Sequence, residues 1–173
     1  SDYAIDLSHS TIGFKVKHLM ISTVSGRFDR FKGTGKYDKK TGVLSDLRVS
    51  IESSSVNTND KKRDKHLRTP DFFSVKKFPK IKFNSNKISV HNKKPNKING
   101  ELTLRGIKKL VSFDVTFGGS GVDPWGNKKV AFTATTKINR KDFGMTWNKS
   151  LDAGGVLVGD EITVVVEIEA NAK

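Results

Sequence analysis

Histidine side chains are the first candidates for metal chemistry in this chain. The four histidines are His9, His18, His66 and His91, and no two of them are two or four positions apart, the spacings typical of metal-binding pairs. His18 and His66 are therefore interpreted as hydrogen-bonded structural residues. Cysteine is absent, which excludes thiolate metal sites and disulfides. The sequence predicts no metal and no cofactor.

Pairs of carboxylates could perform acid–base catalysis, but the aspartates here occupy predicted turns and helix starts, where Asp is favoured for local hydrogen bonding. Neither a G-x-S-x-G motif nor a Walker-type loop occurs. We therefore predict no catalytic residue and a protein that is not an enzyme. The aspartates considered are Asp60, Asp64, Asp71, Asp142, Asp152 and Asp160.

Basic residues outnumber acidic ones, and the net charge is +14. Such a charge is typical of a solvated basic surface, but it also attracts nucleic acid, anionic lipid or an acidic partner. A local cluster shows the same ambiguity, because it fits either a solvated helix face or an electrostatic contact for an anionic head group or a membrane. The cluster consists of Lys61, Lys62, Arg63, Lys65 and Arg68.

Apolar and polar residues alternate along most of the 173 residues, which predicts half-buried β-strands in a single domain over 1–173. A meander of eight such strands tends to close, because closure removes the sheet edges. We therefore predict an all-β fold, an eight-stranded antiparallel up-and-down barrel. The predicted strands are 10–18, 24–37 with a bulge near 29–30, 47–53, 81–83, 98–104, 111–117, 130–138 and 162–170, with a glycine turn at 154–155 before the last.

The alternation stops between Asp60 and Phe83. A short helix is expected to begin near Asp60 and to end before Pro70, which places it after the third predicted strand. Phe72 and Phe73 follow. We interpret this segment as a lid over one end of the barrel.

Five motifs, spaced along nearly the whole chain, resemble those of the YceI-like family. They are Ile12-x-Phe14-x-Val16-x-His18 through Gly26-x-Phe28, Asp60-x-x-Arg63-Asp64-x-His66-Leu67-Arg68 through Phe83, Gly100-x-Leu102-Thr103-Leu104-x-Gly106, Ile138-Asn139-Arg140 through Trp147, and Val158-Gly159-Asp160-Glu161.

The resemblance implies a lipocalin-like barrel with an apolar tunnel for a polyisoprenoid or another long-chain amphiphile. It also implies a dimer in several members and a periplasmic or secreted location. The N-terminal residues contain no basic region followed by an apolar run, so a signal peptide is expected to have been removed.

On this basis we predict non-enzymatic binding, transport or storage of a long-chain isoprenoid, fatty acid or fatty amide. The residues expected to contact the ligand tail are Phe14, Val16, Phe28, Val49, Ile51, Leu67, Phe72, Phe73, Phe83, Leu102, Leu104, Phe113, Val115, Phe132, Ile138, Met145, Trp147, Ile162 and Val164. The residues expected near a polar head group are His66, Arg68, Arg105 and Arg140.

Two other functions stay open. A basic barrel that binds nucleic acid or another polyanion would need aromatic side chains on an outward face. Most of the phenylalanines share the inward phase of the strands, so no nucleic-acid partner is expected. An enzyme acting on isoprenoid lipids is the other alternative. Transient contact of the basic surface with a membrane is also considered.

Overall fold

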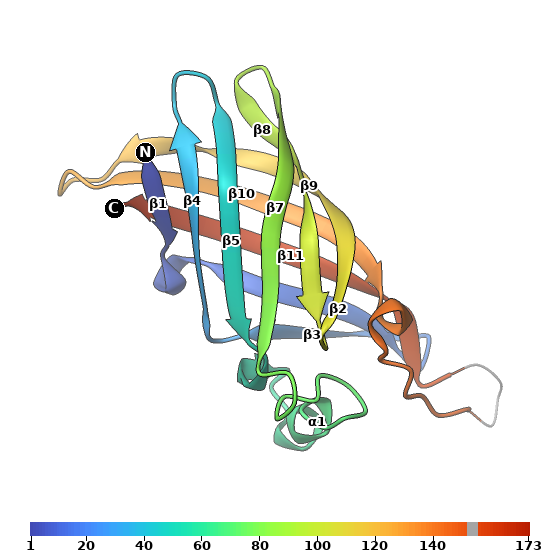
Figure 1. The fold of residues 1–173 in the computed structure, drawn as a ribbon. Helices are drawn as coiled ribbons and strands as arrows, with labels where there is room; N and C mark the ends of the chain where they lie inside the picture. The colour runs from blue at the N-terminus through green and yellow to red at the C-terminus, as the bar shows by residue number, and fades with distance from the viewer. Residues whose placement is uncertain (152–155) are drawn as a thin grey trace.

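The computed structural model describes residues 1–151 and 156–173, and its strands form one antiparallel sheet that closes into a barrel (Figure 1). The strands are β1 (Asp2–Ile5), β2 (Thr11–His18), β3 (Ser22–Phe28), β4 (Phe31–Asp38), β5 (Val43–Glu52), β6 (Val56–Asn57), β7 (Lys80–His91), β8 (Lys94–Leu104), β9 (Ile107–Val122), β10 (Lys128–Asn139) and β11 (Val158–Ala172). The helices are α1 (Lys61–Leu67) and the 3₁₀ turns η1 (Leu7–His9), η2 (Ser53–Ser55) and η3 (Arg140–Phe143).

A ring of eight strands closes through the short strand β1. The order around the ring is β1-β4-β5-β7-β8-β9-β10-β11, and β1 pairs with both β4 and β11. Tyr3 lies opposite Gly35 of β4 and Ala172 of β11. Backbone hydrogen bonds from β1 therefore occupy both edges that would otherwise be exposed.

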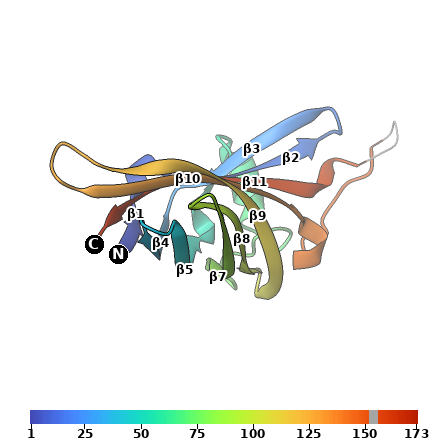
Figure 2. The ribbon, with the colours of Figure 1, turned by 90° about the horizontal axis from the view of Figure 1, so that it is seen from above.

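The remaining three strands form a branch that leaves the ring at β11. Residues 158–167 of β11 pair with β2, whereas residues 170–172 of the same strand pair with β1. β2 pairs with β3 from Ile12 to His18, but β3 pairs with β6 only at Arg27 and Phe28. In the view from above, the β2–β3 hairpin extends away from the ring (Figure 2).

The predicted barrel of eight antiparallel strands is confirmed, but the strands of the ring differ in part from those expected. The sequence interpretation left out β1 and treated 24–37 as one bulged strand, whereas the chain turns at Asp29 and Arg30 into separate strands β3 and β4. The turn is held because Asp29 N donates to Ser55 O and Arg30 N donates to Ser55 Oγ. The turn expected at 154–155 lies outside the described residues.

The predicted helix is present as α1, after β6. The Asp60 carboxylate accepts a hydrogen bond from Arg63 N at 3.1 Å, which caps the first turn and lowers the pKa of Asp60. The buried Asp64 carboxylate accepts from Thr58 N and Thr58 Oγ1 at 2.8 and 2.6 Å. These bonds fix the helix against the chain that leaves the sheet. Within the described residues, no helix is long and apolar enough to cross a membrane.

Side chains on the inner face form two apolar clusters. One surrounds Tyr3, Tyr37 and Leu44 near the end of the barrel where β1 closes the ring. The other joins Ile51 and Phe72 beneath the segment that contains α1. The ring is therefore filled by side chains near β1 and is covered by a separate segment at its other end.

Gly42 provides a test of how the hairpin tips pack. Its φ is +75°, and a Cβ atom there would collide with the Lys93 backbone of the β7–β8 turn. We expect Gly42→Ala to reduce the free energy of unfolding by about 1–3 kcal/mol, measured by urea denaturation. Gly121→Ala is the matched control, because a Cβ atom there meets nothing within 4 Å. Equal stability of the two variants would contradict the packing described.

Candidate ligand-binding site

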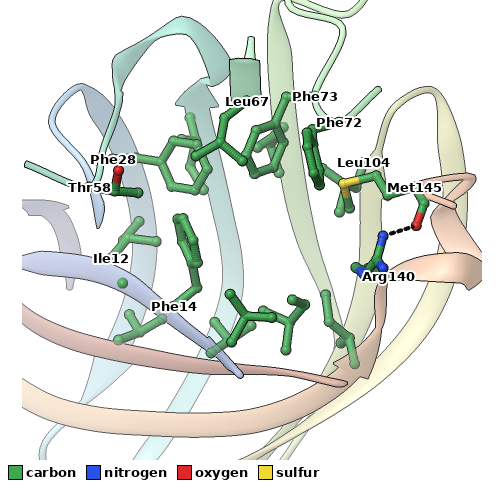
Figure 3. A pocket seen from close by; sticks show the side chains of 18 of the residues that line it. Ile12, Phe14, Phe28, Thr58, Leu67, Phe72, Phe73, Leu104, Arg140 and Met145 are labelled. Carbon is green, nitrogen blue, oxygen red and sulfur yellow. Dashed lines mark hydrogen bonds between the residues drawn. The ribbon is translucent and has the colours of Figure 1, made fainter. Parts of the chain in front are cut away.

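The barrel contains an apolar cavity of about 580 Å³. Strands from all around the sheet contribute to its wall, and the segment with α1 covers one end (Figure 3). Ligand cavities in proteins commonly measure about 300–1,000 Å³. The cavity is thus large enough for a small ligand.

The structure places nearly all residues expected to contact a ligand tail on the wall of this cavity. The exception is Val115, which packs against the apolar cluster near β1 and does not line the cavity. Whether the others bind a ligand stays a prediction. The predicted residues on the wall are Phe14, Val16, Phe28, Val49, Ile51, Leu67, Phe72, Phe73, Phe83, Leu102, Leu104, Phe113, Phe132, Ile138, Met145, Trp147, Ile162 and Val164.

The wall contains further residues that the sequence interpretation had not selected as ligand contacts. Most are apolar and share the inward phase of their strands, so the alternation was sufficient to identify them. Ala134 is an example, because it lies two residues after Phe132 on β10 and is only 3% exposed. The others of this type include Ile12, Leu47, Ile81, Ile98, Val166 and Ile168.

Aromatic side chains close the end of the cavity beside α1. Phe73 packs edge-on against Phe28, with ring centroids 5.4 Å apart, and also contacts Phe14 of β2. Phe72 packs against Trp147 with centroids 5.5 Å apart. The covering segment therefore contacts both the β2–β3 branch and the chain that follows η3.

His66 belongs to the same aromatic group. Its ring lies 4.7 Å from Trp147 and 5.1 Å from Phe72, and Nε2 lies 2.8 Å from Asp71 Oδ2. His66 also lines the cavity. Because one ring nitrogen is hydrogen-bonded to Asp71, the side chain orients the closing segment, as expected for a structural histidine.

Arg140 has a structural position that the head-group prediction did not foresee. Its side chain is 1% exposed, and burial lowers the pKa of the guanidinium. The guanidinium donates to Met145 O at 2.7 Å, Gly159 O at 2.8 Å and Trp147 O at 2.9 Å. With its strongest hydrogen bonds directed to backbone carbonyls, Arg140 holds the chain around Met145 in place (Figure 3).

Arg68 and Arg105, which were expected near a polar head group, do not line the cavity, and their contact with a head group stays a prediction. Arg68 Nε donates to Ser54 O at 3.1 Å, on the outer side of α1. Arg105 lies in the β8–β9 turn and donates to Pro70 O and Gly144 O. Both guanidiniums donate to backbone carbonyls of neighbouring loops. Residue type alone does not show whether an arginine faces the cavity or such carbonyls.

The polar part of the cavity wall lies instead between the β2–β3 hairpin and the first turn of α1. We call this part the mouth. It is lined by Lys17, His18, Val24, Asp60, Lys62 and Arg63. Lys17 and Lys62 are exposed, so the cavity reaches the surface here. Next to Val24, β3 has no partner strand beyond β2 among the described residues, which leaves room for an opening.

The sequence interpretation considered only some of the residues that line the mouth. The basic cluster on α1 was left open between a solvated helix face and an electrostatic contact for a head group or membrane, and the structure brings its residues Lys62 and Arg63 to the cavity. Arg63 Nε and Nη2 donate to Thr58 Oγ1 and Thr58 O, so this guanidinium is already hydrogen-bonded. Lys17 and Lys62 make no salt bridge within the described ranges. They are therefore the cations available at the mouth.

An eight-stranded antiparallel barrel with an internal apolar cavity and a short helical cover belongs to the class of barrels that can enclose one small ligand. Comparison with known sequences gives the family within this class. The family model of the YceI-like domain matches residues 3–170. The chain belongs to the YceI-like family.

Individual relatives agree with this assignment. A UPF0312 protein of Staphylococcus aureus (strain N315) is 34% identical over 174 residues, which cover 100% of this chain and 96% of the relative. A UPF0312 protein of Shewanella baltica (strain OS185) is 37% identical over 169 residues, covering 96% and 86%.

Solved structures show the same fold. The Campylobacter jejuni YCEI protein matches with a TM-score of 0.79 and 34% identity, over 91% of this chain and 90% of its own. A polyisoprenoid binding domain from Saccharophagus degradans matches with a TM-score of 0.72 over 99% and 98% of the two chains, at 13% identity. The latter likeness supports the fold alone.

Replacement of Arg140 tests its structural position. Lysine keeps the charge, but it has no planar fork of donors to reach the separate carbonyls. We expect Arg140→Lys to lower the free energy of unfolding by about 1–3 kcal/mol in urea denaturation, because buried carbonyls lose their donors. Arg68→Lys, which affects one carbonyl outside the cavity, is the control and should change stability by less than about 0.5 kcal/mol. A larger loss in the control variant would argue against this assignment.

Proposed function

We propose that this protein is a non-enzymatic carrier or store for one long-chain amphiphile, an isoprenoid, fatty acid or fatty amide. The observation that carries the proposal is the apolar cavity, which is enclosed by the sheet but reaches the surface at the mouth. The tail would occupy the cavity and the head group would lie at the mouth.

The lining favours long ligands over short ones. Each buried methylene contributes roughly 0.8 kcal/mol, so about ten contribute on the order of 8 kcal/mol before costs. Association and ordering of the chain cost about 4–15 kcal/mol. A short apolar molecule would gain too little to bind stably, whereas a long chain could offset the cost. A smooth apolar wall also distinguishes tails of similar length only weakly.

Two comparisons support the proposal. The chain belongs to the YceI-like family, and a structural neighbour from Saccharophagus degradans is described as a polyisoprenoid binding domain. Transfer of that ligand class to this chain is part of the proposal, because the two sequences are only 13% identical.

The alternative of nucleic-acid binding gains little from the structure. All eleven phenylalanines lie in the described part of the chain, and each is buried or half-buried. They offer no outward platform on which bases could stack. For an enzyme acting on isoprenoids, the histidine–carboxylate pair that reaches the cavity among the described residues is His66 with Asp71, and this pair lies among the aromatic side chains of the closing segment. We therefore favour binding without turnover.

Extraction of the purified protein with organic solvent, followed by mass spectrometry, tests the proposal. We expect a long-chain lipid in stoichiometric amount from the wild-type protein. Ala134→Phe should lower the recovered amount about tenfold or more, because the added ring would occupy space now open to a tail. Recovery of no lipid from the wild type, together with no uptake of added fatty acid or isoprenoid, would contradict the proposal.

Thr135→Phe is the matched control for this variant. Thr135 is the exposed neighbour of Ala134 on β10, so the same ring is added to the outer face of the barrel. This variant should retain the wild-type amount of lipid. Circular dichroism of both variants shows whether the fold is preserved. Equal loss of lipid from two folded variants would argue against binding inside the barrel.

Lys17 and Lys62 lead us to propose that an acidic head group is favoured at the mouth. The double variant Lys17→Glu, Lys62→Glu should bind a fatty acid about tenfold more weakly, because partly exposed charge pairs contribute roughly 0.2–1 kcal/mol each and reversal adds repulsion. The fatty amide of the same chain length is the control and should bind with little change. Competition against a fluorescent fatty acid measures both affinities. Equal weakening for acid and amide would mean that the lysines do not sense head-group charge.

A further inference from the structure

The turn between β2 and β3 exposes three consecutive large apolar side chains. Leu19, Met20 and Ile21, which we call the tip segment, are 38%, 62% and 83% exposed. None of them lines the cavity. Apolar groups exposed in a row contribute nothing to the core, so their placement at a tip indicates contact with something outside the chain.

Backbone geometry makes this choice of residues more unusual. Leu19 and Met20 have φ of +56° and +62°, the left-handed region in which two-residue hairpin turns favour Asn and Gly. The turn is nevertheless held in place, because Leu19 N donates to Leu157 O at 2.9 Å. Leucine and methionine at these positions are therefore not explained by the requirements of the turn.

The two segments that contribute to the mouth, one of which ends in the tip segment, are rich in basic residues. Residues 15–21 contain two lysines and no acidic residue, and residues 60–66 contain four basic residues against two acidic ones. The two segments together have a net charge of +4. One of the acidic residues, Asp64, is buried and hydrogen-bonded to Thr58. The other, Asp60, is exposed and lines the cavity, but the basic residues outnumber it, so the charge near the mouth is positive.

From these observations we propose that the tip segment docks the protein on an anionic membrane surface. The apolar side chains would enter the boundary between head groups and acyl chains, while Lys61 and Lys65 would contact anionic lipid head groups. This inference rests on the proposed function, because docking would bring the mouth of the cavity to the source of its ligand. Apolar residues and basic charge at the same place favour an anionic lipid surface over a neutral one.

A second exposed apolar tip lies at the opposite end of the barrel, in the turn between β9 and β10 (Figures 1 and 2). Trp125 is 83% exposed there, as much as Ile21. Residues 122–129 have a net charge of only +1, and none of them lines the cavity. Trp125 therefore serves as a control of equal exposure.

Sedimentation with vesicles tests the docking. The full chain is mixed with vesicles of phosphatidylcholine, with or without a fraction of phosphatidylglycerol, at about 0.1 M salt. We expect binding to the anionic vesicles, weak binding to the neutral ones, and loss of binding at about 1 M salt, where charges are screened. Binding that ignores both lipid charge and salt would overturn the proposal.

Variants locate the contact. Met20→Glu with Ile21→Glu, and separately Lys61→Glu with Lys65→Glu, should each weaken binding to anionic vesicles about tenfold or more. Trp125→Glu should leave it unchanged. Loss of binding in Trp125→Glu but not in the tip variants would overturn the proposal. So would a wild-type dimer that becomes a monomer in the tip variant without any vesicle binding, because the tip would then be an interface between two copies.

Solvent extraction of the same variants separates this proposal from the proposed function. The tip variants should keep their bound lipid, since the altered residues lie outside the cavity wall. Vesicle binding by a protein that contains and takes up no lipid would leave docking intact while the carrier function fails. Bound lipid in a wild-type protein that does not bind anionic vesicles would support the carrier function and overturn the docking.

Discussion

The last strand, β11, pairs with two different strands along one edge, and the rest of the structure depends on this division. Near its C-terminal end β11 pairs with β1, which closes the ring, and along residues 158–167 it pairs with β2, which leaves the ring. Backbone N–H and C=O groups of a sheet need partners, so the edge of β11 is satisfied in both parts. The barrel is consequently closed near β1 and widened near the β2–β3 hairpin.

This widening explains why an apolar interior contains an open cavity. An eight-stranded ring is just wide enough for its own side chains to fill or for one small ligand. Near β1, Tyr3, Tyr37 and Leu44 fill it. Toward the hairpin the wall includes Phe14 and Val24 of the diverging strands, and the space between the walls stays open. The hydrogen-bonded ladders hold the walls apart, so the interior cannot collapse to remove the space.

Polar groups at this end hold the cover in place. Asp64 and Arg63 both bind Thr58, and Arg140 binds the carbonyls of Met145 and Trp147. A buried polar group is costly unless it is hydrogen-bonded, so each bond also selects one arrangement of the cover. Lys17 and Lys62 are the cations left at the mouth, where an amphiphile would place its head group.

Local sequence patterns determined which strand residues face inward and where α1 begins and ends. Alternation along strands such as 130–138 identified the inward residues, because a strand places every second side chain on the same face. Asp60 and Pro70 bounded α1, because a cap and a proline act within the chain that carries them. Tertiary structure decided the rest. β1 is recognisable as a strand only through its partners, since four residues carry little periodicity. Likewise, Arg140 and Lys62 are both basic, but the fold surrounds Arg140 with backbone carbonyls and leaves Lys62 at the mouth. Contacts between distant segments are not encoded in local spacing.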